Sequence, residues 1–402
     1  MMELAGKRLL LGVTGGVAAY KTAELLRLLI KEGADVQVVM TDAACQFVTP
    51  VTMQALSGKP VYTSMWDARV DNGMPHIELS RDRDLIVVAP ATADFLAKLV
   101  HGRADDLLST LCLARECPLM VAPAMNRQMW DNPATQRNLA QLRQDGLGVV
   151  GPDSGDQACG ETGMGRMLEA TDVLASVIAW FQPKLLAGAR MLITAGPTFE
   201  PIDAVRGITN RSSGRMGYAV AQAAIESGAE VTLISGETAL EAPLGAEVAR
   251  VLTAQQMLDE VMQRIDRCDI FISVAAVADY AVKSRSEHKM KKSDQALSLE
   301  LVPNPDILAA VAGRAAPPFC VGFAAESQNL ETHAEQKRRA KKLPLLAANL
   351  IQDALGSAEN ALVLFDDEGV HRLPKSAKID QARALVRHIA KLYEPRHAQV
   401  GS

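Results

Sequence analysis

The sequence has few of the features that mark a secreted or membrane protein. It contains six cysteines in 402 residues, with no CxxC pair and no histidine at metal-ligand spacing, so we expect neither a disulfide framework nor a structural zinc. No apolar run approaches the roughly 18 residues that a membrane-spanning helix needs. The N-terminus also lacks the pattern of a cleavable signal peptide. These absences predict a cytoplasmic protein.

A strong charge of one sign is also lacking. The chain has 42 Lys and Arg against 47 Asp and Glu, a net charge of -5, so no global field attracts nucleic acid or an anionic membrane. Aromatic residues make up only 4% of a chain that is 48% hydrophobic. A core of small aliphatic side chains is typical of buried parallel strands under helices, and this favours an α/β fold over an all-β fold.

The first half of the chain opens with a βαβ pattern. Residues 8–14 form an apolar run that ends at Gly15 and Gly16, which predicts a strand followed by a tight turn. A helix is expected over residues 18–31, because apolar residues recur there at helical spacing, and a second strand over 33–40.

The second half repeats this pattern. Residues 190–196 form another apolar run that ends in glycine, a helix is expected over 217–227, and a strand starts at 228. We therefore predict two Rossmann-like three-layer α/β domains with mostly parallel sheets. The boundary is placed at the end of the helix expected over 170–180, giving domains 1–184 and 185–402.

Further strands are expected where short apolar runs meet loops, and two of these runs stop at Pro90 and Pro123. Ligands of open α/β sheets gather at the carboxyl ends of the strands, so these loops are the places to search for chemistry. The expected strands are 85–89, 119–122, 270–274, 319–323 and a last one at 361–366, followed by a helix over 378–392 and a frayed tail over 394–402.

The first half has no GxGxxG or Walker motif, so nothing calls for NAD or a P-loop. The turn at Gly15 and Gly16 offers backbone N–H groups and a helix N-terminus to one phosphate, although a tight turn without a ligand has the same pattern. The segment PAMNRQMW places Asn126 among methionines and a tryptophan, which suits a substrate carboxylate or thioether but also a packed loop.

Two further residues are candidates for chemistry in the first half. Cys159 lies in a glycine-rich segment, where a thiol could donate a proton when the loop closes, or could be incidental. His76 could be catalytic or a plain surface residue.

The second half contains two basic clusters, residues 289–292 and 337–342. Either cluster alone is typical of a solvated face. Small-residue loops follow the neighbouring strands, however, at 194–198, 210–214 and 275–279. Together with the lysines they could hold a triphosphate whose charge is shared with Mg²⁺.

These motifs carry a family resemblance. The turn TGGVAAYK at residues 14–21, the loop PATAD at 90–94, PAMNRQMW at 123–130 and the Cys159 segment resemble the FMN-dependent cysteine decarboxylases. From about residue 9 to 393 the chain resembles the bacterial bifunctional phosphopantothenoylcysteine decarboxylases and phosphopantothenate-cysteine ligases of coenzyme A synthesis. Asp94 stands where many relatives have asparagine, and Leu350 where they have an acidic residue.

For the first half, the resemblance implies a flavin that takes a hydride from the cysteine β-carbon and returns it after CO₂ has left. It implies roles for His76 in catalysis, Asn126 in binding the substrate carboxylate and Cys159 in proton donation. The implied FMN contacts are Gly15, Gly16, Val17, Thr41, Ala91, Thr92 and Ser109.

For the second half, the resemblance implies that CTP activates 4'-phosphopantothenate as an acyl-cytidylate, from which cysteine displaces CMP. Asn210 would handle this intermediate, and Lys289 would stabilise charge as it forms. The implied CTP contacts are Ser273, Val274, Ala275, Asp279, Lys289, Pro305, Asp306, Ile307, Leu308, Phe323, Lys337 and Lys341, with Mg²⁺ as cofactor and no ligands assigned to it.

Two other interpretations stay open, a flavoprotein that decarboxylates a peptidyl cysteine and a non-catalytic regulatory relative. The attached ligase half argues against the first, and the presence of both His76 and Cys159 argues against the second. The expected partners are 4'-phosphopantothenate, cysteine and CTP, with no nucleic acid and no membrane. The resemblance also implies a homo-oligomer in which decarboxylase trimers are linked through ligase dimers.

Overall fold

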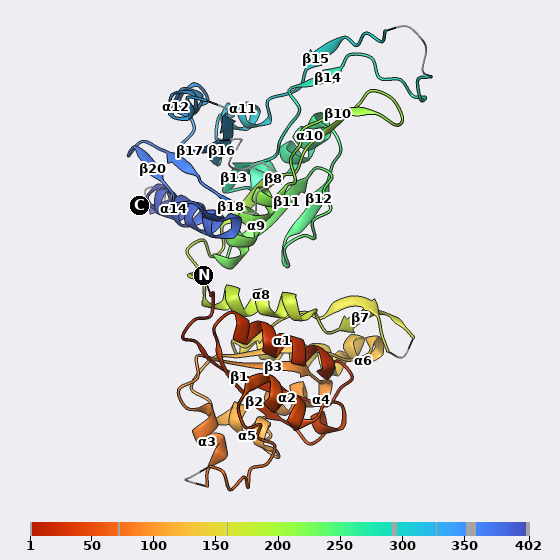
Figure 1. Cartoon of the computed structure of the whole chain (residues 1–402), viewed down its shortest axis with the longest axis vertical. Helices are drawn as coiled ribbons and strands as arrows, with labels where there is room; N and C mark the ends of the chain where they lie inside the picture. Colours follow the sequence, from red (N-terminus) through yellow and green to blue (C-terminus); the bar gives the residue numbers. More distant parts are fainter. Residues whose placement is uncertain are drawn as a thin grey trace. The chain divides into compact units, whose positions relative to one another are not determined.

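A computed structural model describes residues 2–70, 73–158, 160–291, 296–326, 328–350 and 359–398. The chain divides into two compact units, residues 1–181 and 182–402, each with its own sheet and helices (Figure 1). Among the described residues, no helix combines the length and apolar character needed to cross a membrane.

The first unit is built on a five-stranded parallel sheet in the order β2-β1-β3-β4-β5. Its strands are β1 (Arg8–Val13), β2 (Asp35–Met40), β3 (Leu85–Ala91), β4 (Leu119–Pro123) and β5 (Gly148–Val149), with a separate hairpin of β6 (Asp153–Asp156) and β7 (Thr162–Arg166). Its helices are α1 (Ala19–Lys31), α2 (Pro50–Ser57), α3 (Pro75–Ser80), α4 (Ala93–Val100), α5 (Leu107–Ala114), α6 (Arg127–Asp131), α7 (Pro133–Gln144) and α8 (Ala170–Phe181).

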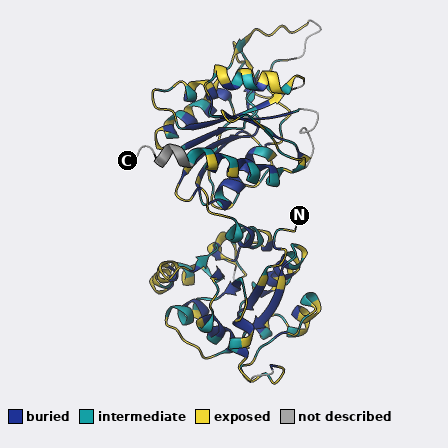
Figure 2. Cartoon of the chain, turned by 90° about the vertical axis from the view of Figure 1, so that its left-hand side faces the viewer, coloured by how far each residue is buried: buried dark blue, intermediate teal, exposed yellow. Residues whose placement is uncertain are grey.

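Helices cover both faces of this sheet because successive strand residues point to opposite sides. Leu9 and Leu11 of β1 belong to a core that includes residues of α1 and α8, whereas Leu10 belongs to a second core with residues of α4, α5 and α7. The three-layer arrangement is therefore the predicted one, and the strands are the most buried part of the unit (Figure 2).

The second unit has an eight-stranded sheet in the order β12-β11-β8-β13-β16-β17-β19-β20. It is parallel from β12 to β17, and β19 and β20 run antiparallel at one edge. The sheet strands are β8 (Arg190–Ala195), β11 (Glu230–Ser235), β12 (Glu247–Arg250), β13 (Ile270–Ser273), β16 (Phe319–Glu326), β17 (Leu345–Leu350), β19 (Val363–Phe365) and β20 (Val370–Arg372).

Short strand pairs outside this sheet carry loops, and helices again cover both faces. The pairs are β9 (Phe199–Pro201) with β10 (Gly207–Thr209), β14 (Tyr280–Val282) with β15 (Leu301–Pro303), and β18 (Glu359–Asn360) with β21 (Ser376–Ala377). Residues of α9 (Arg215–Glu226) and α14 (Lys378–Ala398) pack on one face, and residues of α10 (Ala254–Arg264), α11 (Ile307–Ala312) and α12 (Leu330–Ala340) on the other.

The predicted fold class, α/β with mostly parallel sheets, is confirmed, and three local expectations are wrong. β3 continues through Pro90, since the missing N–H falls where the register between β3 and β4 shifts. The strand expected over 361–366 is not the last one, because β20 and β21 follow it. The expected tail is helical as far as Ala398.

Candidate functional site

The first unit has a cavity of about 780 Å³ where the carboxyl ends of its parallel strands meet. Loops after β1, β2, β3 and β4 line it, together with the segment before β7. Of the residues predicted to contact FMN or substrate, Gly15, Gly16, Val17, Thr41, Thr92 and Asn126 line this cavity. These segments are far apart in the sequence, and only the sheet brings them together.

Two helices begin at the wall of this cavity. Gly16 to Ala18 lead into α1, and Thr92 caps the N-terminus of α4 by accepting a hydrogen bond from the Phe95 N–H. The N-terminal end of a helix carries partial positive charge, so two such ends favour an anionic group in the cavity.

The two glycines of the turn have different surroundings. A Cβ on Gly15 would lie 2.4 Å from the Cβ of Ala43, whereas a Cβ on Gly16 would have only the Thr92 methyl, at 3.8 Å, as a near neighbour. Gly15 therefore permits close packing of the turn on the next loop. Gly16 leaves open space on the cavity wall that a larger residue would occupy.

Asn126 is held in a network that joins α6 to the β6–β7 hairpin. Its Oδ1 accepts from the Met129 N–H at 3.0 Å, and its Nδ2 donates to Gln128, which in turn donates to Glu161. Gln157 accepts from the Arg127 N–H at 3.0 Å and, with Ala158, lines the cavity. Cys159 lies outside the described residues.

Burial makes the described cysteines poor candidates for reactive thiols. None of the five described cysteines forms a disulfide, and burial raises the pKa of Cys112 and Cys268 to about 12. Burial likewise raises the pKa of Cys45 and Cys117. A thiol with a raised pKa is a weaker nucleophile and acid at neutral pH.

Three predicted residues of the first unit do not line the cavity. Ala91 is buried in β3. Ser109 is also buried, and it forms a capping box with Asp106 at the start of α5. His76 is half-buried in the short helix α3. Asp94 does line the cavity, and a carboxylate oxygen lies 3.7 Å from the Lys98 Nζ.

Sequence reasoning missed Lys21, a buried cation at the cavity wall. Its side chain is 5% exposed, and its Nζ donates to the Met167 carbonyl at 2.9 Å and to Glu169 at 2.8 Å. The hydrogen bond from Lys21 holds the pKa of Glu169 below its usual range. Lys21 lies in the glycine-turn motif, but its spacing gives no sign of a partner almost 150 residues away.

The second unit has a cavity of about 1020 Å³. It lies at the carboxyl ends of β13, β16 and β17 and at the start of α9 and α11. The predicted residues that line it are Asn210, Ser273, Val274, Ala275, Asp279, Pro305, Asp306, Ile307, Leu308, Phe323, Lys337 and Lys341.

Buried threonines hold the loops of this cavity together. Thr194 accepts from the Ala275 N–H at 3.3 Å, and Thr198 accepts from the Ala278 N–H at 3.0 Å. The Asn210 Nδ2 donates to the carbonyls of Ala276 and Val277 at 3.1 and 3.0 Å. The loop after β8, the loop after β13 and Asn210 therefore form one hydrogen-bonded wall.

Positive charge dominates the second cavity, since five basic and only two acidic side chains line it. Lys337 and Lys341 are one helical turn apart at the end of α12, so they lie on the same face. Lys341 forms an ion pair with Asp306. Burial alone would raise the pKa of Asp306, but hydrogen bonds from Lys341 and the Ala309 N–H, together with nearby lysine charge, outweigh burial, and the pKa lies below its usual range.

Other polar residues of this cavity were not predicted from the sequence. They are Arg211, Arg215, Asn304, Asn349, Asn360 and Lys378. The two arginines flank the SSG of the NRSSGR segment, so that motif could have indicated them. Asn360 and Lys378 come from elements near the C-terminus, and no local pattern marks them.

Lys289 does not line the cavity. It is exposed in the segment between β14 and β15, and its neighbour Met290 is tethered to the turn after β9. The Met290 N–H donates to Asp203, whose pKa is held well below its usual range by a hydrogen bond from Arg206. The structure therefore places Lys289 beside that turn.

Two protein families match the chain, one for each unit. The Flavoprotein family matches residues 2–182, and the DNA/pantothenate metabolism flavoprotein C-terminal domain family matches residues 186–393.

Relatives match over nearly the whole length. The coenzyme A biosynthesis bifunctional protein CoaBC of Vibrio vulnificus strain YJ016 is 48% identical over 398 residues, covering 98% of this chain and 99% of that protein. The protein of the same name from Escherichia coli K12 is 46% identical, with 98% and 100% covered. The one from Bacillus subtilis 168 is 42% identical, with 97% and 98% covered.

Solved structures match one part of the chain at a time. A crystal structure of the C-terminal domain of a CoaBC protein is 39% identical with a TM-score of 0.47, covering 53% of this chain and 99% of that one. The FMN-dependent cysteine decarboxylase SpaF is 35% identical with a TM-score of 0.40, covering 44% and 98%. Identity above 40% over the full length of the relatives shows that this chain belongs to the CoaBC family of bifunctional coenzyme A biosynthesis enzymes.

Proposed function

We propose that this enzyme carries out two consecutive steps of coenzyme A synthesis, with one active site in each unit. The second unit, within residues 185–402, ligates 4'-phosphopantothenate to cysteine at the expense of CTP. The first unit, within residues 1–184, decarboxylates the product to 4'-phosphopantetheine with FMN. The observation that carries the proposal is that most of the residues expected to hold FMN and CTP, scattered along the chain, line two cavities, one in each unit.

The first cavity fits FMN in size, and two helix N-termini at its wall suit the phosphate. Its volume is that of a typical cofactor site. The ends of α1 and α4 and the open space beside Gly16 suit a phosphate, and the Thr41 and Thr92 side chains line the same wall. Bound FMN supplies reversible hydride acceptance, so the decarboxylation needs no net oxidant.

The chain's own residues would orient the substrate and move a proton. The Asn126 Nδ2 would exchange Gln128 for the substrate carboxylate, which holds the departing CO₂ group in place. The Cys159 thiol would donate the proton that, together with the hydride returned from bound FMN, converts the enethiol intermediate to the saturated thiol product; a thiol is a far stronger acid than a serine hydroxyl. His76 is proposed as a further catalytic group and Val17 as a further FMN contact. The family resemblance also implies Ala91 and Ser109 as FMN contacts, although they do not line the cavity.

The second cavity fits a nucleoside triphosphate. Its excess of basic side chains would neutralise the phosphates, as Lys337 and Lys341 reach it from one helix face. Asn210, held by two carbonyls, would position the acyl-cytidylate. Lys289 would offset the charge that grows when the carboxylate attacks the α-phosphate. We propose Mg²⁺ as the cation that accompanies CTP.

Incubation of the purified protein with 4'-phosphopantothenate, cysteine and CTP tests both steps by mass spectrometry. We expect 4'-phosphopantothenoylcysteine first and 4'-phosphopantetheine second, with CMP and pyrophosphate released. Omission of cysteine should leave an acyl-cytidylate, and omission of CTP should leave no product. A flavin-loaded protein that makes neither product would refute the proposal.

Assembly and location belong to the same proposal. We propose a cytoplasmic homo-oligomer in which decarboxylase trimers are linked through ligase dimers. Light scattering during size-exclusion chromatography measures the mass of the full-length protein, and a monomer would contradict this assembly.

A further inference from the structure

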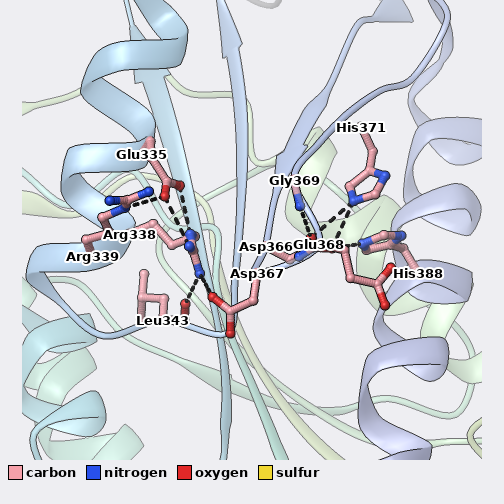
Figure 3. A network of polar contacts seen from close by, with 10 residues as sticks. All are labelled: Glu335, Arg338, Arg339, Leu343, Asp366, Asp367, Glu368, Gly369, His371 and His388. Carbon is pink, nitrogen blue, oxygen red and sulfur yellow. Dashed lines mark hydrogen bonds and ion pairs between the residues drawn. The ribbon is translucent and has the colours of Figure 1, made fainter.

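One carboxylate and two imidazoles converge at the antiparallel edge of the second unit (Figure 3). Asp366 follows β19, His371 lies in β20, and His388 lies in α14. The His388 Nε2 is 2.6 Å from the Asp366 Oδ2, and the His371 Nε2 is 3.1 Å from both carboxylate oxygens. The three donor atoms lie within 4.8 Å of one another.

The carboxylate of this cluster is fixed from behind. The Asp366 Oδ1 accepts from the backbone N–H groups of Glu368 and Gly369 at 2.8 and 3.0 Å (Figure 3). Its side chain is 1% exposed, whereas those of His388 and His371 are 13% and 35% exposed. The backbone therefore holds the buried carboxylate in place, and solvent can reach the cluster from the side of His371.

The charges around the cluster are already paired elsewhere. Asp367 forms an ion pair with Arg338 at 2.7 Å, and Glu368 forms one with Lys391 at 2.7 Å. The Asp366 carboxylate is therefore left to the two histidines, and it accepts a hydrogen bond from the Nε2 of each.

We propose that Asp366, His371 and His388 bind one divalent transition-metal ion, with zinc as the reference. Two imidazole nitrogens and one carboxylate oxygen, with water in a fourth position, form a common ligand set for zinc. Coordination through Nε2 requires the proton that each ring uses in its hydrogen bond to Asp366 to move to Nδ1. Tetrahedral bonds of about 2.0–2.1 Å also require the donor atoms to separate to about 3.3 Å. Most of this movement falls on the His388 Nε2, which is 2.6 Å from the Asp366 Oδ2, whereas the His371 Nε2 at 3.1 Å is already close to the required separation.

The proposed site is separate from the CTP cavity. Phe365, just before Asp366, pairs with Leu346 near the start of β17, whereas Asn349 near the end of β17 lines the cavity. The metal would therefore join the β19–β20 hairpin to α14 at the opposite end of the strand and take no part in catalysis. The sequence led us to expect no structural zinc, because the chain has no CxxC pair and its cysteines have no histidine at metal-ligand spacing.

Cobalt substitution of the tag-free, chelator-treated full-length protein tests the proposal. Co²⁺ bound to nitrogen and oxygen in four-coordinate geometry gives visible d–d bands without a thiolate charge-transfer band, and Zn²⁺ should displace it with a stoichiometry of one. His371→Gln and His388→Gln should each weaken Zn²⁺ binding by roughly tenfold or more, at least the loss that removal of a supporting group causes. His101→Gln, which changes an exposed histidine of the first unit, is the matched control.

The variants also separate this site from the nucleotide site. Pyrophosphate release from CTP should be unchanged in His371→Gln, the variant of the more exposed ligand and the one less prone to misfold. Zn²⁺ affinity that is the same in the wild type and both ligand variants would overturn the proposal. A Co²⁺ spectrum dominated by a thiolate band, or no Co²⁺ binding at all, would also overturn it.

Discussion

At the scale of single residues, two adjacent glycines have separate tasks. Gly15 permits close packing against Ala43, and Gly16 leaves space at the wall of the first cavity. Adjacent positions in one motif can therefore be distinguished by what a methyl group would meet. The distinction yields a matched pair of substitutions.

Gly16→Ala should leave the fold intact and weaken FMN binding. Its methyl group would occupy space proposed for the phosphate, and overpacking costs about 1–3 kcal/mol, or roughly tenfold or more in affinity. Gly15→Ala should instead lower the thermal stability of the flavin-free protein, because its Cβ would clash with Ala43. Flavin fluorescence titration and calorimetry check the pair. Equal losses of thermal stability in Gly15→Ala and Gly16→Ala would contradict this prediction.

Lys289→Gln should abolish acyl-cytidylate formation while decarboxylation continues. The lysine is exposed beside the β9 turn, so its proposed role depends on positive charge that glutamine lacks. Loss of one preorganised electrostatic contact costs roughly 10²–10³ in rate. Pyrophosphate release without cysteine measures this step, with Lys291→Gln as the control. A fall of less than about tenfold would favour a diffuse basic field over a specific contact.

At the scale of secondary-structure elements, buried charges fix the helices that border the cavities. Lys21 joins α1 to the segment before α8. Arg338 joins α12 to Leu343, just before β17, and to Asp367 after β19 (Figure 3). Because α1 and α12 also contribute cavity residues, these links connect stability to ligand binding.

Arg338→Met should lower the free energy of unfolding of the second unit by about 2 kcal/mol, because it removes charge-assisted hydrogen bonds from a side chain that is 9% exposed. It should also raise the KM for CTP, since α12 carries Lys337 and Lys341. Arg339→Met is the control, because that side chain is 75% exposed. Urea unfolding and ligase kinetics measure both effects, and equal losses in the two variants would count against this link.

The ion pair between Lys21 and Glu169 should make the first unit more stable at neutral than at acidic pH. The pKa of Glu169 is lower in the folded protein than in the unfolded chain. The stabilisation that the ion pair gives the folded unit is therefore fully present above the pKa of the unfolded chain. It is lost as pH falls through the folded pKa. Glu169→Gln should therefore flatten the dependence of the unfolding temperature on pH below about pH 5, whereas the exposed Glu24→Gln should not. If the unfolding temperatures of wild type and Glu169→Gln changed with pH in parallel, the ion pair would not contribute to the pH dependence of stability.

At the scale of the whole molecule, each unit has its own sheet and its own cores on both sheet faces. Among the residues that the structure describes, each of the two cavities is lined by residues of its own unit. A chain organised in this way can catalyse two reactions that use no catalytic residue in common.

The two halves should therefore be separable. A fragment that begins at Leu185 should fold and ligate 4'-phosphopantothenate to cysteine without FMN, because its core is complete. Circular dichroism and pyrophosphate release measure folding and activity. A fragment that is inactive unless residues 1–184 are supplied would mean that the domains are wrongly divided.

The sequence by itself determined the α/β class, the two opening βαβ units and most strand positions. Apolar periodicity and glycine turns are local signals, and a local signal suffices to specify a helix or strand. It was insufficient where packing competes with the local pattern, as at Pro90, where the shifted register lets β3 continue.

Only the tertiary structure decided which residues share a site. The sheet brought Gly16, Thr92 and Asn126 to one cavity, but it left Ser109 in a helix cap. It tethered the neighbour of Lys289 to Asp203 and joined Lys21 to Glu169. It also brought together the Asp366 cluster, whose members lie on three elements. Such contacts join distant parts of the chain, and their geometry is set by strand order and helix packing, which no short pattern records.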